Sequence, residues 1–276
     1  MSKKKYDKYS SNRAVISLFS GAMGLDIGLE KAGLSVMIGQ DSNVSCVETI
    51  KANGHKVLGG DIKTIDPQTL LNLSGMHVGE PFLICGGPPC QPFSTAGRRR
   101  GINDPRGSLF MDFIRMIDYI QPRFFVMENV KGIMSAPLKH IPIKDRDSDY
   151  QKNRFGTVLD VILTEFKKLG YKTVYGVLDA VNYGVPQFRE RFVLIGSRDQ
   201  ENIFLPLPTH FQMHQNPEYQ WRTVADAIHG LEKEDGECAV LTDERKQYLR
   251  QIPEGGNWKD LPEECVQAAM GGAYTA

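Results

Sequence analysis

Residues 14–32 have the sequence AVISLFSGAMGLDIGLEKA, and this stretch decides the fold. Positions 14–19 are mostly apolar and rich in β-branched side chains, which is typical of a buried strand. Glycines at positions 21 and 24 follow directly, and a helix-like pattern then extends to Ala32. The order of strand, tight turn and helix predicts the first unit of an α/β fold.

The same unit recurs along the chain. Apolar, strand-like runs alternate with amphipathic, helix-like runs, and this alternation favours a mostly parallel sheet with helices on both faces. We therefore expect a doubly wound, Rossmann-like α/β fold, in which ligands bind at the carboxyl ends of the strands. Further strands are expected at residues 34–39, 81–85, 123–127, 172–178 and 191–196, with another ending at Gly60, and further helices at 43–53, 108–120 and 155–169.

The composition indicates a globular, intracellular protein. Of 276 residues, 41% are hydrophobic, enough for a substantial core, and 33 basic residues balance 33 acidic ones. Net charge therefore gives no sign of a polyanionic partner, although local basic patches can still bind phosphate. The 5 cysteines show no repeated paired spacing, which favours a reducing, cytoplasmic location over a disulfide framework. The sequence contains no apolar run near the roughly 20 residues that a membrane-spanning helix needs.

The pattern predicts three parts. Residues 1–12 are polar and lysine-rich and are expected to form a flexible basic tail. Residues 13–198 contain the periodic strands and helices and are expected to form the main domain. Prolines at 206, 208 and 217 then interrupt the periodicity, so residues 199–276 are expected to be a linker and an incomplete small domain.

Acidic residues follow two of the expected strands, at the edge where a ligand would bind. Asp41 ends its strand about 20 residues after the glycine turn, a placement that suits hydrogen bonds to ribose hydroxyls. The alternative for Asp41 is a structural role as a helix cap or turn residue. Asp61 follows the next strand in the same way. The chain lacks both the G-x-G-x-x-G fingerprint and a P-loop, so a different adenosine-containing cofactor is favoured.

The most specific motif is the loop Gly-Gly-Pro-Pro-Cys-Gln-Pro-Phe-Ser at residues 86–94. Its glycines and prolines restrict the backbone to an unusual path directly after an apolar strand. Cys90 therefore lies on a stiff loop at the ligand-binding edge, where a thiolate is suited to nucleophilic attack. Cys85 lies within the strand and is expected to be a buried structural residue. We expect no metal, because no second Cys/His pair follows at the spacing of zinc ligands.

The loop at 86–94, the turn Phe-Ser-Gly-x-x-Gly at 19–24 and the sequence Glu-Asn-Val at 128–130 resemble motifs of the cytosine-5 DNA methyltransferase family. The resemblance covers residues 16–196 in unbroken family order, and includes Gly-Asp-Ile at 60–62, Arg-Gly-Ser-Leu-Phe at 106–110 and Gln-Phe-Arg-Glu-Arg at 187–191. It implies the class I S-adenosylmethionine-dependent methyltransferase fold. It also implies methyl transfer to C5 of a cytosine in double-stranded DNA.

The resemblance implies a covalent mechanism on a cytosine that is flipped out of the duplex. Cys90 would attack C6 of the ring, and Glu128, at the end of a strand, would donate to the ring nitrogen N3. Burial beside the base would raise the pKa of the Glu128 carboxyl and favour its protonated form. Arg189 is implied to hold the target cytosine and Arg191 to order the site. A structural ion pair is the alternative for Arg191.

The resemblance also implies a pocket for S-adenosyl-L-methionine. Asp41 stands where the family usually has glutamate, and it is implied to bind the ribose. Asp61 is implied to bind the adenine amino group. The other residues implied to line this pocket are Phe19, Gly21, Gly24, Ile62, Pro88 and Leu109.

Arginines between the Cys90 loop and the next helix are candidates for DNA contacts. The segment 97–106 contains arginines that can neutralise phosphates and glycines that permit closure over DNA. The alternative is a solvated charge cluster, but in this position the resemblance implies a mobile catalytic loop. The predicted DNA contacts are Gln91, Ser94, Arg98, Arg99 and Arg106.

Past a segment like residues 271–272, the family continues into a target-recognition domain and a final segment that completes the cofactor pocket. A split enzyme, a truncated product and a fragment all stay open as expectations, and for a split enzyme a second polypeptide would supply the recognition domain and the final motifs. A silent cofactor- or DNA-binding subunit is another alternative. A tRNA cytosine methyltransferase is a third, although Ser94 favours the DNA enzymes. The expected setting is a bacterial or phage-encoded restriction-modification system.

Overall fold

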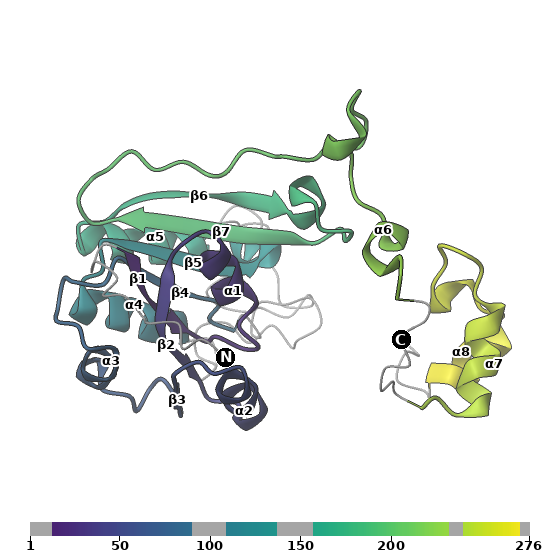
Figure 1. Ribbon diagram of the computed structural model, residues 1–276, viewed down its shortest axis with the longest axis horizontal. Coiled ribbons are helices and arrows are strands. Elements are labelled where there is room, and N and C mark those ends of the chain that lie inside the picture. The colour runs from purple at the N-terminus through teal and green to yellow at the C-terminus, as the bar shows by residue number, and fades with distance from the viewer. Residues whose placement is uncertain (1–12, 90–108, 137–156, 232–239, 271–276) are drawn as a thin grey trace, which may run out of the picture. The chain divides into compact units, whose positions relative to one another are not determined.

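The computed structural model describes residues 13–89, 109–136, 157–231 and 240–270 (Figure 1). The chain divides into two compact units, Met1–Ala227 and Ile228–Ala276. All strands of the described sheet and the candidate site residues belong to the first unit. Within the described residues, no helix has the length and apolar character that crossing a membrane requires.

A seven-stranded sheet forms the centre of the first unit, with strand order β3-β2-β1-β4-β5-β7-β6. Neighbouring strands from β3 to β5 pair in parallel, which confirms the predicted mostly parallel sheet. The strands are β1 (Ala14–Leu18), β2 (Ser35–Asp41), β3 (Val57–Gly59), β4 (Leu83–Gly86), β5 (Phe124–Val130), β6 (Lys172–Asp179) and β7 (Glu190–Ser197).

Strand β7 runs antiparallel to both of its neighbours, β5 and β6, which the sequence pattern did not predict. The connection between β6 and β7 contains only the short 3-10 helix η5 (Ala180–Tyr183) and a turn. A parallel neighbour needs a crossover of a dozen or more residues, usually a helix, so this short connection returns the chain in the opposite direction. As a result the first residues of β7 lie at the edge where the parallel strands end.

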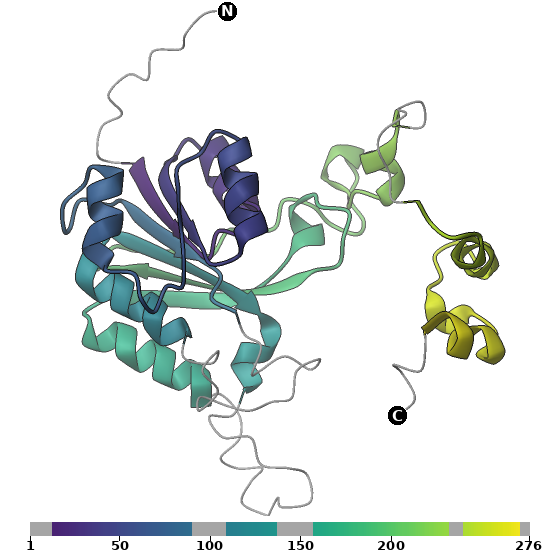
Figure 2. The ribbon, with the colours of Figure 1, turned by 90° about the horizontal axis from the view of Figure 1, so that it is seen from below.

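One face of the sheet carries most of the core. Helices α3, α4 and α5 cover this face (Figure 2) and contribute Leu70, Phe113 and Phe166, all of them fully buried. Phe125 of β5 lies between them, with its ring stacked 4.0 Å from that of Phe166. The helices are α3 (Pro67–Ser74), α4 (Leu109–Ile120) and α5 (Thr157–Lys168).

Helices α1 (Gly24–Lys31) and α2 (Val44–Ala52) pack on the opposite face. A smaller apolar cluster there joins Val15, Leu83 and Cys85 of the sheet to Leu29 of α1. The predicted helix at 43–53 is thereby confirmed as α2, and Asn43 caps it by accepting the backbone N–H of Ser45. Covering both faces in this way is what a buried parallel sheet requires.

Two features of the elements differ from the sequence prediction. Strand β5 continues through Glu128 to Val130, three residues beyond its predicted end, because β7 pairs with that extension. Helix α3 was not predicted, although Asp66 caps it and Pro67 occupies its first turn. The short 3-10 helix η3 (Lys131–Ser135) follows β5 directly.

Residues 198–227 continue the first unit without a further strand of the sheet. Asn202 accepts a hydrogen bond from Lys172 Nζ at 2.8 Å, and the carbonyl of Pro206 accepts one from the Tyr183 hydroxyl at 2.9 Å. These bonds hold the segment along β6. It also includes η6 (Pro217–Tyr219) and most of α6 (Val224–Ile228).

The second unit is small and helical. Thr242 caps its first helix by accepting the backbone N–H of Arg245, and Leu261 is the most deeply buried of its described apolar residues. The boundary predicted at residue 198 stays a prediction for the functional domains. The elements of this unit are α7 (Asp243–Gln251), η7 (Trp258–Asp260) and α8 (Glu263–Met270).

Candidate active site

The turn after β1 has an unusual backbone. Phe19, Gly21 and Met23 all have positive φ angles, of 54°, 55° and 65°. Positive φ is uncommon for residues other than glycine, and such strain persists only where the surrounding structure holds it in place. A Cβ added to Gly21 would meet no heavy atom within 4 Å, so open space lies next to this turn. Gly24 is exposed and begins α1.

Asp41 ties this turn to the end of β2. Its Oδ2 accepts the backbone N–H of Gly21 at 2.8 Å, and its Oδ1 accepts the backbone N–H of Asn43 at 2.8 Å. The structural role considered for Asp41 is therefore confirmed. Each carboxylate oxygen can accept more than one hydrogen bond, so the group retains capacity for ribose hydroxyls, and that role stays a prediction.

Gln40 links the first and third turns and was missed by the sequence analysis. It is 1% exposed, its Oε1 accepts the backbone N–H of Phe19 at 3.4 Å, and its Nε2 donates to the carbonyl of Gly60 at 2.7 Å. A buried amide must find such partners. The predicted cofactor residues at the ends of β1 and β3 are thus joined by one side chain between them.

The two residues after Gly60 lie in different environments. Asp61 is exposed, and its Oδ1 accepts the backbone N–H of Lys63 at 3.0 Å. The Ile62 side chain is 2% exposed and belongs to the main core, so a cofactor contact from Ile62 would involve its backbone. Leu109 begins α4 and, like Phe19, is half-buried against that core.

The start of the Pro-Pro-Cys loop is fixed by close backbone packing. A Cβ on Gly86 would lie 2.5 Å from the carbonyl oxygen of Leu18, and one on Gly87 would lie 3.0 Å from Glu128 Oε2. Only glycine therefore fits at position 86 without displacing backbone, and a side chain at position 87 would shift the carboxyl of Glu128. Asn129, which is buried, donates from Nδ2 to the carbonyl of Pro88 at 2.9 Å. The last described residue of this loop is Pro89, and the following predicted site residues, Cys90, Gln91, Ser94, Arg98, Arg99 and Arg106, lie outside the described residues.

Glu128 and Arg191 form an ion pair at the edge of the sheet. The distance between Arg191 Nε and Glu128 Oε1 is 2.7 Å, and the two side chains are 25% and 38% exposed. The pairing of β5 with antiparallel β7 brings them to adjacent strands. The ion pair considered for Arg191 is therefore present, and it also sets the orientation of Glu128. Arg189 is exposed immediately before β7, and its backbone N–H donates to Asp179 Oδ1 at 2.8 Å.

Cys85 is a buried structural residue, as predicted. It is 0% exposed, and burial raises the pKa of its thiol, which disfavours the reactive thiolate. Its Sγ lies 3.7 Å from Oδ1 of Asp26, a buried carboxyl that the sequence analysis did not single out. Burial raises the pKa of Asp26, and its Oδ2 has no hydrogen-bond partner among the described residues.

The geometry defines a class of protein. A glycine turn beside open space, an acidic residue at the end of β2 and a Glu-Arg pair at the end of β5 share the carboxyl edge of a doubly wound sheet. Such an edge is where α/β proteins bind an adenosine-containing ligand next to a second substrate. The described residues contain no group of three or more His, Cys, Asp and Glu placed to hold a metal ion.

Comparison with known proteins identifies the family. The model of the C-5 cytosine-specific DNA methylases matches residues 13–269, which is most of the chain. The chain therefore belongs to this family, and the resemblance found in its motifs is confirmed. The cofactor of the family is S-adenosyl-L-methionine.

Several curated relatives are type II methyltransferases. M.AquIA of Picosynechococcus sp. is 37% identical over 237 residues, which cover 79% of this chain and 89% of the relative. M1.HphI of Haemophilus parahaemolyticus is 34% identical, and 94% of this chain covers 66% of that protein. M.NgoFVII of Neisseria gonorrhoeae is 31% identical, with 92% of this chain covering 64% of that protein. The chain thus spans nearly all of one relative and about two thirds of the other two.

Solved structures show the same fold. A prophage-encoded protein of E. coli superposes with a TM-score of 0.58 at 22% sequence identity, over 94% of this chain and 68% of that one. Spodoptera frugiperda DNMT2 superposes with a TM-score of 0.54 at 20% identity, over 84% of this chain and 61% of that one. These likenesses confirm the predicted class I methyltransferase fold.

The turn after β1 fits the family's cofactor. The open space beside Gly21 leaves room for a ligand against the backbone, and Asp41 offers carboxylate oxygens at the same place. The buried side chain of Gln40 fixes the distance between this turn and Gly60. These residues would hold the ribose and adenine parts of S-adenosyl-L-methionine.

Proposed function

We propose that this chain methylates C5 of a flipped cytosine at specific sites in double-stranded DNA, through a covalent bond between Cys90 and C6. The observation that supports the proposal best is the placement of Glu128. Arg191 holds its carboxyl at 2.7 Å, and Gly87, three residues before Cys90, packs against it. The loop that carries Cys90 in the sequence therefore begins beside the carboxyl of Glu128, as a nucleophile and an acid acting on one base would require. The type II relatives favour a restriction-modification setting.

The chain's residues would act in a fixed order. The Cys90 thiolate forms a bond to C6, and the electron pair of the C5–C6 double bond moves to C5 while Glu128 donates a proton to N3. S-adenosyl-L-methionine would supply the electrophilic methyl group for C5, with its sulfonium–methyl bond breaking and S-adenosyl-L-homocysteine leaving as the neutral thioether. Transfer of the C5 proton to solvent then returns the C5–H electron pair to the C5–C6 double bond, the carbon–sulfur bond breaks, and Cys90 leaves as a thiolate. N3 returns its proton to Glu128.

The charged residues of β7 position the reacting groups. Arg191 orients the Glu128 carboxyl through their ion pair, at the edge where the cytosine ring would bind. Arg189, exposed two residues before Arg191 in the chain, would hold the cytosine itself. Asn129 keeps the carbonyl of Pro88, and with it the start of the Cys90 loop, in place.

Transfer of labelled methyl groups to DNA tests the proposal. The purified chain is incubated with labelled S-adenosyl-L-methionine and unmethylated DNA, and the same is done with Cys90→Ala and with Cys85→Ala as the matched control. We expect Cys90→Ala to lose both the transfer and the covalent adduct with 5-fluorocytosine DNA, because its nucleophile is gone. Cys85→Ala should retain both, since Cys85 is buried within β4. Equal activity of the wild-type chain and Cys90→Ala would refute the mechanism.

A second candidate function is that of a catalytic chain that methylates DNA only together with another polypeptide. This chain matches about two thirds of M1.HphI and of M.NgoFVII. Methyl transfer would then require two components: the catalytic edge of this chain, and a second polypeptide that corresponds to the remaining third of those relatives. Adduct formation that appears only when such a polypeptide is added would favour this candidate, and adduct formation by the chain alone would contradict it. Including tRNA beside DNA in both assays tests the RNA alternative.

A further inference from the structure

Exposed aromatic side chains adjoin the proposed catalytic edge. Phe188 immediately precedes Arg189 and is 76% exposed. Its ring meets that of Trp221 edge to face, with the ring centroids 5.5 Å apart. Trp221 belongs to residues 209–222, which we call the aromatic arm. The edge that holds Glu128 and Arg191 is therefore continuous with a surface that the mechanism does not use.

The aromatic arm is attached to the first unit by several hydrogen bonds. The carbonyl of Asn182 accepts the backbone N–H groups of Thr209 and His210, each at 2.9 Å, and its side-chain Oδ1 accepts Trp221 Nε1 at 3.0 Å. The His210 ring also packs on Gly184, where a Cβ would lie 2.7 Å from Cε1. Both ends of the arm are thus fixed to the turn that leads to Phe188.

Backbone and ring contacts also hold the arm internally. Phe211 N–H donates to the carbonyl of Tyr219 at 2.8 Å, and Trp221 N–H donates to the carbonyl of Phe211 at 2.9 Å. The rings of Phe211 and His214 stack at 5.8 Å, and those of His214 and Tyr219 meet edge to face at 5.3 Å. The arm therefore presents a row of rings in a fixed geometry.

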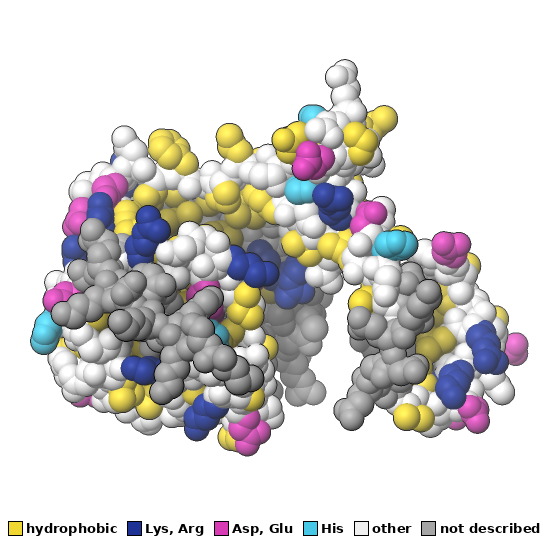
Figure 3. Space-filling model, in the orientation of Figure 1, with side chains coloured by type: hydrophobic (Ala, Val, Ile, Leu, Met, Phe, Trp, Pro, Cys, Tyr) yellow, Lys and Arg dark blue, Asp and Glu magenta, His cyan; other side chains and the backbone are white. Residues whose placement is uncertain are grey.

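These apolar groups are held in contact with solvent. Met213 is 87% exposed, and Phe211 and Tyr219 are 43% and 46% exposed. Figure 3 shows hydrophobic, histidine, basic and acidic side chains side by side at the upper end of this unit. A contiguous apolar patch that the fold keeps exposed usually marks a binding surface.

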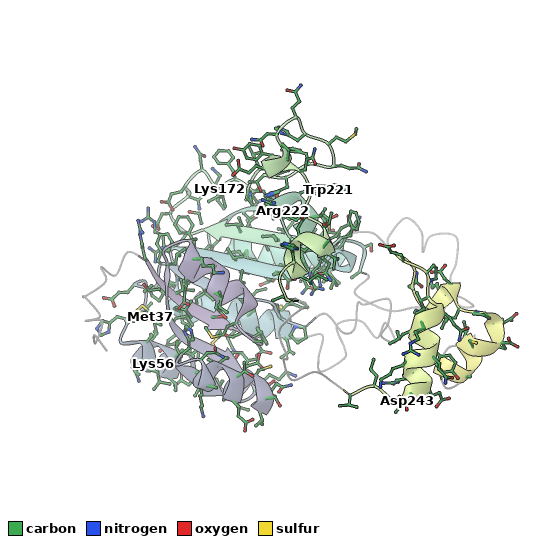
Figure 4. All side chains as sticks on the ribbon, turned by 45° about the vertical axis from the view of Figure 1, so that its right-hand side comes forward. Met37, Lys56, Lys172, Trp221, Arg222 and Asp243 are labelled. Atoms are coloured by element: carbon green, nitrogen blue, oxygen red, sulfur yellow. The ribbon has the colours of Figure 1, made fainter. Side chains whose placement is uncertain are left out.

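The charges near the arm indicate the kind of partner. Arg189 lies beside Phe188, and Arg222 follows Trp221 at the end of the arm (Figure 4). Both arginines are exposed, and Glu218 is the one acidic residue of the arm. Exposed rings next to arginines match a nucleic-acid strand, whose bases stack on aromatic faces and whose phosphates pair with cations. A protein partner would explain the rings but not their position next to Arg189, which is proposed to hold the cytosine.

We propose that Phe188 and the aromatic arm form a DNA-binding surface that holds the strand next to the flipped cytosine. Phe188 stacks on a base that flipping leaves unstacked, and Arg222 neutralises a nearby phosphate. The inference rests on the proposed function, because that function places the target cytosine at Arg189. It assigns to the first unit a DNA contact that is separate from the Cys90 loop.

Binding measurements with two DNA probes test the inference. Fluorescence anisotropy of a labelled random-sequence duplex, and of the same duplex with one extrahelical cytosine, gives the Kd of the wild-type chain and of each variant. Phe188→Ala should weaken binding to the second probe about fivefold to a hundredfold, because a stacked base is lost. Arg222→Ala should weaken binding to both probes and reduce the slope of log Kd against log salt by about one. Phe204→Ala is the matched control, since Phe204 is 78% exposed and lies outside the arm, and it should leave both Kd values unchanged.

The outcomes separate this inference from the proposed function. If the wild-type chain methylates or binds DNA and the Phe188 and Arg222 variants bind as tightly as it does, the inference is wrong and the proposed function stands. If the variants change the oligomeric state instead of the Kd for DNA, the surface is a protein-docking site and the inference is also wrong. If the wild-type chain neither binds nor methylates DNA, both fail. Thermal melting of every variant checks that the fold is retained.

Discussion

At the scale of single residues, the ion pair between Glu128 and Arg191 is compatible with both roles considered for Arg191. One role is structural, and the other is to order the site. The ion pair is structural, yet it also fixes the carboxyl that is proposed to act at N3. An arginine can hold a carboxylate in one orientation because its planar guanidinium presents donors in a rigid fork. Arg191 thus stabilises this edge of the sheet and also orients the carboxyl that is proposed to take part in catalysis.

Replacing Glu128 measures how much the carboxyl contributes. Glu128→Gln retains the shape but cannot donate a proton as a carboxylic acid, so we expect methyl transfer to slow by about 10²- to 10⁴-fold. Initial rates with labelled S-adenosyl-L-methionine provide the measurement. Glu190→Gln is the control, because Glu190 forms a comparable exposed ion pair with Lys131 at 2.8 Å. A loss of activity in both variants of similar size would contradict a specific role for Glu128.

Asp26 predicts a pH dependence of stability. Burial is the largest cause and raises its pKa above the usual 3.8; the hydrogen bonds with Ser17 and Cys85 act next and lower the pKa, nearby Glu30 raises it, and His55 lowers it. A raised pKa in the folded state means that the carboxyl favours folding at low pH and that this contribution is lost as pH rises through the folded pKa. Each unit of the shift corresponds to about 1.4 kcal/mol.

The comparison with Asp26→Asn isolates this effect. As pH rises above 3.8, we expect the unfolding free energy of the wild-type chain to fall relative to that of the variant, which cannot ionise at this position. Urea unfolding at a series of pH values gives both free energies. A difference that stays constant, or that changes in favour of the wild-type chain as pH rises, would contradict the burial argument.

At the scale of elements, the glycine that ends β4 allows this strand to approach β1 closely. A Cβ on Gly86 would lie 2.5 Å from the Leu18 carbonyl oxygen and 3.0 Å from the Phe113 ring. We therefore expect Gly86→Ala to lower the unfolding free energy by about 1–3 kcal/mol, as overpacking in a core does. Thermal or urea unfolding measures the change. Gly28→Ala is the control, because a Cβ there meets nothing within 4 Å and alanine favours helix α1; a loss of stability in Gly28→Ala equal to that of Gly86→Ala would refute the steric explanation.

The sequence predicted the elements that depend on local pattern. The strand at 14–19, the helix at 43–53 and the strand at 172–178 lie within about two residues of their observed bounds. Their signals, apolar periodicity and capping residues, are contained in a short window. Helix α3 was missed although its cap at Asp66 and the following proline are local signals as well.

Features that depend on pairing between distant segments were not predictable in this way. The extension of β5 exists because β7 pairs with it, and β7 is reversed because its connection is too short for a crossover. Gln40 and Asn129 are important for the same reason, since each bonds to a backbone carbonyl 20 or 41 residues away. A buried glutamine at the end of a strand is the one local signal that could have drawn attention to Gln40.

At the scale of the whole molecule, cofactor binding should stabilise the fold. A ligand that binds only the folded state raises the unfolding free energy by about 2.7 kcal/mol when its concentration is 100 times its Kd. We expect S-adenosyl-L-methionine to raise the melting temperature accordingly, and Asp41→Ala to lose most of this increase. Differential scanning fluorimetry with and without the cofactor measures it.

A second aspartate provides the control for that experiment. Asp66 caps α3 by accepting the backbone N–H of Gln68 at 3.0 Å, so Asp66→Ala also removes a capping carboxylate. It should lower the melting temperature without the cofactor but keep the increase that the cofactor causes. If Asp41→Ala responds to the cofactor as strongly as Asp66→Ala does, Asp41 has no role in cofactor binding.

The two halves of the sheet, one of which includes the reversed strand β7, carry different parts of the proposed site. Strands β1, β2 and β3 end at the residues proposed for the cofactor, whereas β4, β5 and β7 provide those proposed for the base. Because β7 begins where the others end, the turn between β6 and β7 can change in length or sequence without altering the cofactor half. The turn between β6 and β7 therefore offers one place where the surface that faces the substrate can change in evolution while the residues proposed for the source of methyl groups stay where they are.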